Sequence, residues 1–313
     1  MALNLPLFYR RGPVVLLDDD ADYLAMLASV LPARWSLVPH TDPAAFLQRM
    51  QAEATAWAAE QARQQSLIDR WREGQGLLVA LLREWAGGPG HPPVAQTCVV
   101  DYAMGETNGL EVLQALPDWP GARILLTGHA DEQLAVQAFN QGLIDQFIGK
   151  QAPDAMARLR AALDGAAGLP RPQRDARWCA VLRPEQQALL QVPAVVQALQ
   201  AGVLQQWDDY AVLGEPFGLL GRDAAGRCQW LQLEATAALD EPAELAAAAG
   251  LDPALVRAVR AGQRLPAVEL HQQLGLPGAV RTAPAFALDG TGLLTAALFP
   301  LAPQDLPPLA GWA

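Results

Sequence analysis

The 313-residue sequence predicts an N-terminal α/β domain with a doubly wound, five-stranded parallel sheet, followed by an α+β domain with an antiparallel sheet. Two observations predict the first domain: short apolar runs alternate with amphipathic stretches, and polar residues stand where the apolar runs end. Two hairpin patterns late in the chain predict the antiparallel sheet. The chain is about twice as long as a typical domain, which agrees with two domains.

The strands and helices of the first domain follow one another along the chain. The run at 14–19, which is apolar and ends in Asp, is followed by a helical pattern of apolar residues at 22–31. The same order returns at 96–101, 122–128 and 144–150, each followed by an amphipathic stretch. Strands that alternate with helices form a parallel sheet covered on both faces, and binding sites form at the carboxyl ends of its strands.

One segment interrupts the alternation. The chain runs 82 positions from Asp19 to Asp101, whereas the helix, strand and helix expected there need roughly 45. The sequence therefore predicts a helical insertion at about 51–95. Its apolar seam has positions separated by multiples of seven, which favours a helix pair packed on its own domain, with a dimerisation arm as the alternative. The seam consists of Trp57, Trp71, Leu78 and Trp85, and it is broken by Gly74 and Gly76.

The expected domain boundaries follow from composition. The first domain covers 1–165, including the insertion. Residues 166–175 are rich in Gly, Pro and Arg, which is typical of a linker. The second domain then covers 176–313.

Charge and cysteine content exclude several classes of protein. The formal net charge of −11 argues against electrostatically driven binding to nucleic acid or to anionic membrane. Cys98, Cys179 and Cys228 are odd in number and lack metal-binding spacing, so we expect reduced thiols. No apolar run is long enough to span a bilayer, and the N-terminus lacks the charge order of a secretory signal. We therefore expect a cytoplasmic protein that does not bind membranes.

Carboxylates gather where the strands of the first domain end. Asp18 and Asp19 follow one strand, and Asp101 ends another. Like charges brought together out of water repel one another, so this arrangement requires a counter-charge. Hard divalent cations such as Mg²⁺ prefer oxygen ligands, which predicts a magnesium site. Asp20, one residue further, is expected to cap the following helix.

At these residues the sequence resembles the receiver domain of two-component response regulators. The matching pieces, in chain order, are "VVLLDDD", "VVDYAMGETNGLEVL", "ILLTGHAD" and "IDQFIGK". The resemblance covers about 1–165 once the insertion is excluded. It implies that the partner is a histidine kinase or a phosphotransfer protein. It also implies that the receiver catalyses its own phosphoryl transfer and slow autodephosphorylation, which is not the activity of a classical enzyme.

The resemblance implies a role for each residue at the strand ends. Asp101 would accept the phosphoryl group from phosphohistidine as a carboxylate nucleophile. Asp19 and Asp101 would ligate magnesium directly, with the backbone carbonyl of Ala103 as a third ligand, and Asp18 would help through water. The hydroxyl of Thr127 would bond a phosphoryl oxygen.

The remaining implied roles belong to the last strand of the sheet. Lys150, which is the only lysine in the chain, would pair with the phosphoryl group. Phe147 would be the switching aromatic residue that turns inward when Thr127 moves. Two positions depart from the family pattern, because Gly105 and Gln151 stand where proline is usual. The second departure predicts a less rigidly positioned Lys150.

The second domain matches no output domain that we recognise. The hairpin patterns at 216–233 and 284–301 predict an antiparallel sheet of about four strands with helices on one face. The stretch at 244–266 resembles the helix-turn-helix of phage-repressor-like regulators. From residue 166 onward the chain carries 10 basic and 14 acidic residues, which disfavours DNA binding.

Three hypotheses for the whole chain follow. The first is a response regulator that acts through protein contacts or assembly, and we expect it to form a homodimer. The second is a DNA-binding transcriptional regulator that uses the stretch at 244–266. The third is a regulator whose output domain is an enzyme or a small-molecule sensor.

Overall fold

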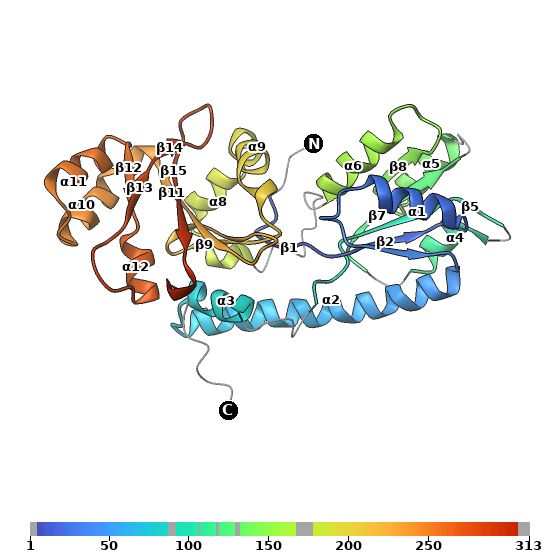
Figure 1. Ribbon diagram of the computed structural model, residues 1–313, viewed down its shortest axis with the longest axis horizontal. Helices are drawn as coiled ribbons and strands as arrows, with labels where there is room; N and C mark the ends of the chain where they lie inside the picture. Colours follow the sequence, from blue (N-terminus) through green and yellow to red (C-terminus); the bar gives the residue numbers. More distant parts are fainter. Residues whose placement is uncertain are drawn as a thin grey trace. The chain divides into compact units, whose positions relative to one another are not determined.

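The computed structural model describes residues 5–86, 92–105, 107–116, 119–128, 132–166 and 178–305. Its contacts divide the chain into two compact units (Figure 1). The parallel-sheet unit comprises Arg10–Arg63 and His91–Arg171, and the antiparallel-sheet unit comprises Met1–Tyr9, Gln64–Gly90 and Pro172–Ala313.

These units differ from the expected ranges 1–165 and 176–313 at the N-terminus and in the insertion. Most of the expected linker, residues 167–175, lies outside the described residues.

The parallel-sheet unit contains the five-stranded parallel sheet that the sequence predicts. Its strand order is β3-β2-β4-β7-β8, and each neighbouring pair is parallel. The central strands β2 and β4 are buried along their whole length, as expected for strands covered on both faces. The five strands are β2 (Val14–Leu17), β3 (Leu37–His40), β4 (Thr97–Asp101), β7 (Ala122–Thr127) and β8 (Gln146–Gly149).

Helices cover both faces of this sheet (Figure 1). Helices α1 (Ala21–Val30) and α6 (Ala155–Ala166) pack on the face that carries Val14 and Leu16. The other face carries Val15 and Leu17 and is covered by α2 (Pro43–Arg72), α4 (Gly109–Gln114) and α5 (Glu132–Asn140). Alternate residues of one strand therefore enter two different cores, as the period of two in a β-strand requires.

The first part of α2 is fixed to the parallel sheet by buried polar contacts. Trp57 Nε1 donates to the Ala95 carbonyl at 2.9 Å, and the Ala95 N–H donates to Glu53 Oε2 at 2.7 Å. The carboxylates of Glu53 and Glu60 are buried, and Arg49 and Arg63 respectively pair with them. Buried carboxylates are tolerated only with such partners.

Residues 64–86 of the insertion belong to the antiparallel-sheet unit. Helix α2 ends at Arg72, and Gly74 adopts φ +93°, a conformation that favours glycine, before α3 (Leu77–Ala86) begins. Leu78 and Trp85 are buried in the core of that unit, whereas Trp57 is buried in the core beside the parallel sheet. The expectation of a helix pair packed on its own domain is therefore corrected, because the second half of the seam is buried in the core of the antiparallel-sheet unit.

The antiparallel-sheet unit is built on a six-stranded sheet in the order β1-β9-β10-β11-β15-β14. Both predicted hairpins are confirmed, because β10 pairs with β11 and β14 pairs with β15, each antiparallel. The sheet has six strands rather than four, since β1 and β9 add to it. The strands are β1 (Phe8–Arg10), β9 (Asp209–Gly214), β10 (Phe217–Arg222), β11 (Cys228–Ala235), β14 (Phe286–Ala287) and β15 (Leu294–Leu301).

Three fully buried tryptophans, Trp178, Trp207 and Trp230, are among the largest side chains in the core of this unit. Gly221 of β10 leaves room for one of them, since a Cβ there would lie 1.9 Å from the ring of Trp207. The remaining elements are α8 (Pro184–Leu190), α9 (Pro193–Gly202), α10 (Asp240–Ala248), α11 (Pro253–Arg260), α12 (Val268–Leu274), β12 (Arg264–Pro266) and β13 (Thr282–Pro284), with 3₁₀ turns at Cys179–Val181, Leu204–Gln206, Thr236–Ala238 and Pro303–Asp305.

No single helix in the described part of the chain is both long and apolar enough to cross a bilayer. One helix pair, Pro184–Leu190 with Pro193–Gln206, meets those limits of length and composition together, but it is bent by 68°.

Glu234, near the end of β11, is a half-buried carboxylate among other acidic residues. It lies opposite Thr295 of β15, and Gln232 Nε2 donates to its Oε1 at 2.8 Å. Burial raises the pKa of Glu234 to about 7. The hydrogen bond from Gln232 opposes this shift, while the negative charges of Glu269 and Glu241 add to it. The protonated form is therefore favoured in the folded protein.

We expect Glu234→Gln to make the protein more stable at alkaline pH. A raised pKa gives stability that is complete below the ordinary value of 4.5 and is lost as the pH rises through about 7. Between pH 5.5 and pH 8 the wild type should lose about 2 kcal/mol of unfolding free energy relative to the variant. Urea unfolding at both pH values measures this difference. Glu244→Gln, at an exposed glutamate of α10, is the control, and an equal change in both variants would contradict the prediction.

Candidate functional site

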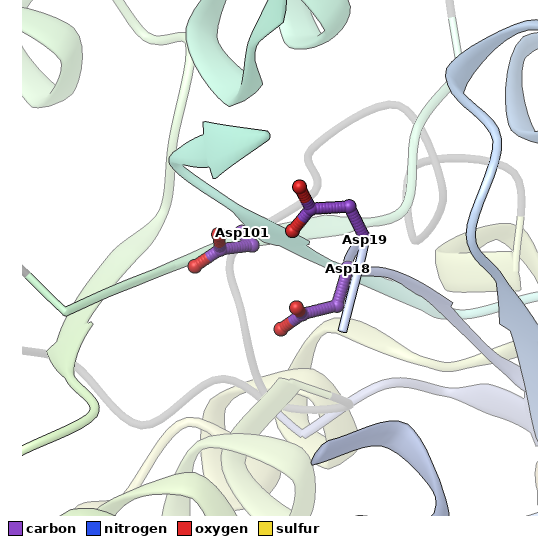
Figure 2. A group of neighbouring side chains, drawn as sticks. All are labelled: Asp18, Asp19 and Asp101. Carbon is purple, nitrogen blue, oxygen red and sulfur yellow. The ribbon is translucent and has the colours of Figure 1, made fainter. Parts of the chain in front are cut away.

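The three aspartates that the sequence predicts to converge do so at one edge of the parallel sheet. Asp18 and Asp19 directly follow β2, Asp101 is the last residue of β4, and these two strands are neighbours in the sheet. Figure 2 shows their side chains turned toward a common space. One carboxylate oxygen from each lies within 4.8 Å of the others. Asp18 and Asp101 are buried, whereas Asp19 is exposed.

Lys150 supplies a positive charge between the two buried carboxylates. Its Nζ lies 2.6 Å from Asp18 Oδ2 and 2.7 Å from Asp101 Oδ1. The residue follows β8, and its backbone N–H donates to the Thr127 carbonyl at 2.7 Å, which fixes the backbone beside β7. The predicted acceptor, lysine and threonine are thus brought to one edge of one sheet.

Burial and charge act in opposite directions on the pKa values of this cluster. Burial alone would lower the pKa of Lys150, but its close contacts with Asp101 and Asp18 outweigh that effect and raise the pKa. Burial raises the pKa of Asp18, against the opposing effect of the Lys150 charge. Lys150 therefore stays charged near neutral pH.

Backbone N–H groups orient the buried carboxylates. The N–H of Asp20 donates to Asp18 Oδ1, and the N–H of Ala103 donates to Asp101 Oδ2, both at 3.1 Å. Asp20 itself is the N-cap of α1 and accepts from the N–H groups of Asp22 and Tyr23, as the sequence predicts. The Asp20 carboxylate therefore caps α1.

The loop after Asp101 carries the predicted backbone ligand. Ala103 begins β5 (Ala103–Met104), which pairs with β6 (Thr107–Asn108). Gly105, which stands where the family usually has proline, adopts φ +57°. Proline cannot adopt this conformation, so the departure has a structural reason. Gly109 is also required, since a Cβ there would lie 2.0 Å from the Asp101 carbonyl oxygen.

Thr127 and Phe147 occupy neighbouring strands. Thr127 is the last residue of β7, and its side chain is buried. Strand β7 is the neighbour of β4, and Leu126 lies opposite Asp101. Phe147 of β8 is partly buried and packs against the core on the α2 face of the sheet.

Sequence reasoning missed one residue at this site. The ring of Tyr23 covers Lys150, with 4.4 Å between Nζ and the ring centroid. The sequence carried a usable signal, because Tyr23 stands three residues after the helix cap Asp20. That spacing places it on the first turn of α1, beside the end of β2.

The donor set fits a hard divalent cation. Three carboxylates with oxygens this close carry three negative charges, and Lys150 supplies one positive charge. Oxygen ligands at this density match the preference of Mg²⁺, which also retains several waters. Asp18, Asp19 and Asp101 would hold such an ion.

Comparisons with known proteins bear on the fold. No family model and no curated protein matches this chain. Among solved structures, the response regulator LqsR of Legionella pneumophila is 19% identical, with a TM-score of 0.63, and the match covers 98% of this chain and 94% of LqsR. The signal receiver domain of an HD domain-containing protein from Pseudomonas fluorescens Pf-5 is 20% identical, with coverage of 56% of this chain and 96% of that one and a TM-score of 0.35. A receiver domain protein from Clostridium thermocellum is 16% identical, with coverage of 50% and 94% and a TM-score of 0.32.

The match to LqsR runs over nearly the whole of both chains. This chain therefore shares the fold of LqsR over nearly its whole length, and its parallel-sheet unit has a receiver fold. The resemblance predicted from the four sequence pieces is confirmed at the level of the fold.

We expect Mg²⁺ to raise the thermal stability of the protein through the three aspartates. A ligand at ten times its dissociation constant stabilises the folded state by about 1.4 kcal/mol. Asp19→Asn should remove most of this gain without disturbing the fold, because Asp19 is exposed. Thermal denaturation with and without MgCl₂ measures the effect. Asp22→Asn, at an exposed aspartate of α1, should respond like the wild type, and an equal response in both variants would rule out this site.

Proposed function

We propose that this chain is a cytoplasmic response regulator of a two-component phosphorelay, in which Asp101 accepts a phosphoryl group from a histidine kinase or phosphotransfer protein. The observation that best supports the proposal is the ammonium of Lys150, held 2.6 Å from Asp18 and 2.7 Å from Asp101 at the carboxyl edge of the sheet. A carboxylate nucleophile, further acidic ligands and a point cation are the groups that phosphoryl transfer to aspartate needs.

In the proposed reaction an oxygen of Asp101 attacks the phosphorus of the phosphohistidine. The P–N bond breaks, and the imidazole leaves with its electron pair. Bound Mg²⁺ would neutralise charge on the phosphoryl oxygens. Asp18, Asp19 and Asp101 would hold the ion, together with the backbone carbonyl of Ala103.

The other two groups act on the transferred phosphoryl group. Lys150 Nζ already lies against Asp101 Oδ1, so it can pair with a phosphoryl oxygen by a short movement. The Thr127 hydroxyl would donate to another phosphoryl oxygen, and Phe147, two strand positions from Gly149, would turn inward in response. The chain needs no separate output enzyme for this step, because the receiver itself provides the reacting groups.

The output is proposed to act through assembly. Helix α5, which follows the Thr127 strand, exposes Val136 by 59% and Phe139 by 54% of their surface. Val136 and Phe139 stand one helical turn apart, so they can contribute to a contact surface for another protein. We propose that phosphorylation repacks the face formed by α5, β8 and α6 and that the partner is a second copy of the chain.

DNA binding is the second candidate. Helices α10 and α11 are joined by a turn in which Gly250 adopts φ +78°, so the stretch at 244–266 does form a helix, a turn and a helix. Two of its three arginines are engaged within the protein, however. Arg260 Nε lies 2.7 Å from Asp240, and Arg264 donates to Thr282. Arg260 is paired with Asp240, and the stretch also carries Glu244 and Asp252, so little net positive charge faces a phosphate backbone and assembly remains the favoured output.

We expect Asp101→Asn to abolish phosphoryl labelling. The amide is a poor nucleophile and a poor metal ligand, so incorporation from acetyl phosphate or from a phosphorylated kinase should fall at least 100-fold. Labelling should also require Mg²⁺ and disappear in EDTA. Asp22→Asn is the control and should be labelled like the wild type. Labelling of Asp101→Asn at the wild-type level would overturn the proposal.

We also expect the phosphoryl mimic beryllofluoride to change the mass of the wild type in sedimentation with Mg²⁺. Asp101→Asn should show no change, because it cannot hold the mimic. Phe139→Gln should weaken any dimer that forms, since it removes an exposed apolar contact without affecting the core. A mass that is the same in all three proteins, with and without the mimic, would contradict the assembly hypothesis.

A further inference from the structure

The ammonium of Lys150 is surrounded on three sides. Two sides are the carboxylates of Asp18 and Asp101, and the third is the ring of Tyr23, whose centroid lies 4.4 Å from Nζ. The side chain of Lys150 is only 17% exposed. The two carboxylates supply most of the attraction on the ammonium. Because both are acceptors at similar distances, they do not by themselves fix the ammonium beside Asp101.

Tyr23 is itself held in place from both ends. Its backbone N–H donates to the cap residue Asp20 at 3.0 Å, which fixes it on the first turn of α1. Its ring is partly buried against the core on the α1 face of the sheet, together with Ala152 and Met156, which follow Lys150 in the chain. The ring therefore cannot move away from the ammonium without repacking.

A ring face attracts a cation through its quadrupole, and the attraction grows as water is excluded. The Tyr23 ring adds a third contact to the ammonium beside those of the two carboxylates. The ring face accepts no strong hydrogen bond, so it restricts Lys150 without replacing Asp18 or Asp101 as the partner of the ammonium. The peptide bond between Lys150 and Gln151 is trans.

We propose that Tyr23 is a positioning residue for Lys150, which keeps the ammonium beside Asp101 where the phosphoryl group arrives. This inference rests on the proposed phosphoryl transfer. It assigns to α1 a direct part in the site, through a contact between segments that are more than 120 positions apart in the sequence.

The contact itself can be tested without any phosphorylation. Lys150 is the only lysine of the chain, so untagged protein labelled selectively at lysine gives one ε-methylene signal by NMR. Protons over an aromatic face shift upfield. We expect an upfield signal in the wild type and in Tyr23→Phe, and a signal near that of free lysine in Tyr23→Leu. A signal that is unchanged in Tyr23→Leu would overturn the contact.

The action through Lys150 is tested by a double-mutant cycle on the rate of labelling by acetyl phosphate. We expect Tyr23→Leu to slow labelling between about threefold and thirtyfold and Tyr23→Phe to retain most of the rate. In a Lys150→Ala background, Tyr23→Leu should have no further effect. An equal loss in both backgrounds would show that Tyr23 acts only by packing α1, which overturns the inference. If the wild type itself is not labelled, the proposed function fails, and the Lys150 signal still decides whether the ring holds the ammonium.

Discussion

The site depends on one ion-pair cluster, in which Lys150 joins the carboxylates of Asp18 and Asp101. Each of these groups stands at the carboxyl end of a strand of the same parallel sheet. Two buried carboxylates at this distance would repel each other strongly without the ammonium. The ammonium that follows β8 therefore offsets the repulsion between the acidic strand ends at this edge. The helices that cover both faces in turn keep this edge fixed.

The sequence predicts the parallel sheet well because burial on both faces demands a continuous apolar run. Such runs at β2, β4 and β7 are followed by polar groups, and the end of each run locates a site residue. The short β1 carries no comparable pattern. It is a strand because it pairs with β9, and just before it the Leu7 carbonyl accepts from the Val212 N–H, about 200 positions away in the sequence. Long-range pairing of this kind leaves no local signal.

The insertion shows what periodicity can and cannot predict. Trp57, Leu78 and Trp85 lie on a helical seam, which correctly predicts that one face of the insertion is buried. The spacing does not state which surface covers that face, and the seam is in fact shared between two cores. Tyr23 is a similar case. The position of Tyr23 on its helix predicts an inward ring. The cation that the ring covers, Lys150, is distant in the sequence and follows the last strand of the sheet.

Charge balance explains why the cluster suits a reversible modification. Lys150 offsets only one of the three aspartate charges, so the edge keeps an excess of negative charge that a divalent cation can neutralise. Under the proposed function, a phosphoryl group on Asp101 adds further negative charge and moves the strongest acceptor outward from the carboxylate. Lys150 must then turn from Asp18 toward the phosphoryl oxygens. Because Lys150 Nζ contacts Asp18 as well as Asp101, that movement breaks the contact with Asp18 at the end of β2, while the Tyr23 ring of α1 stays beside the ammonium. A local change of charge is thereby coupled to the packing of the elements around it.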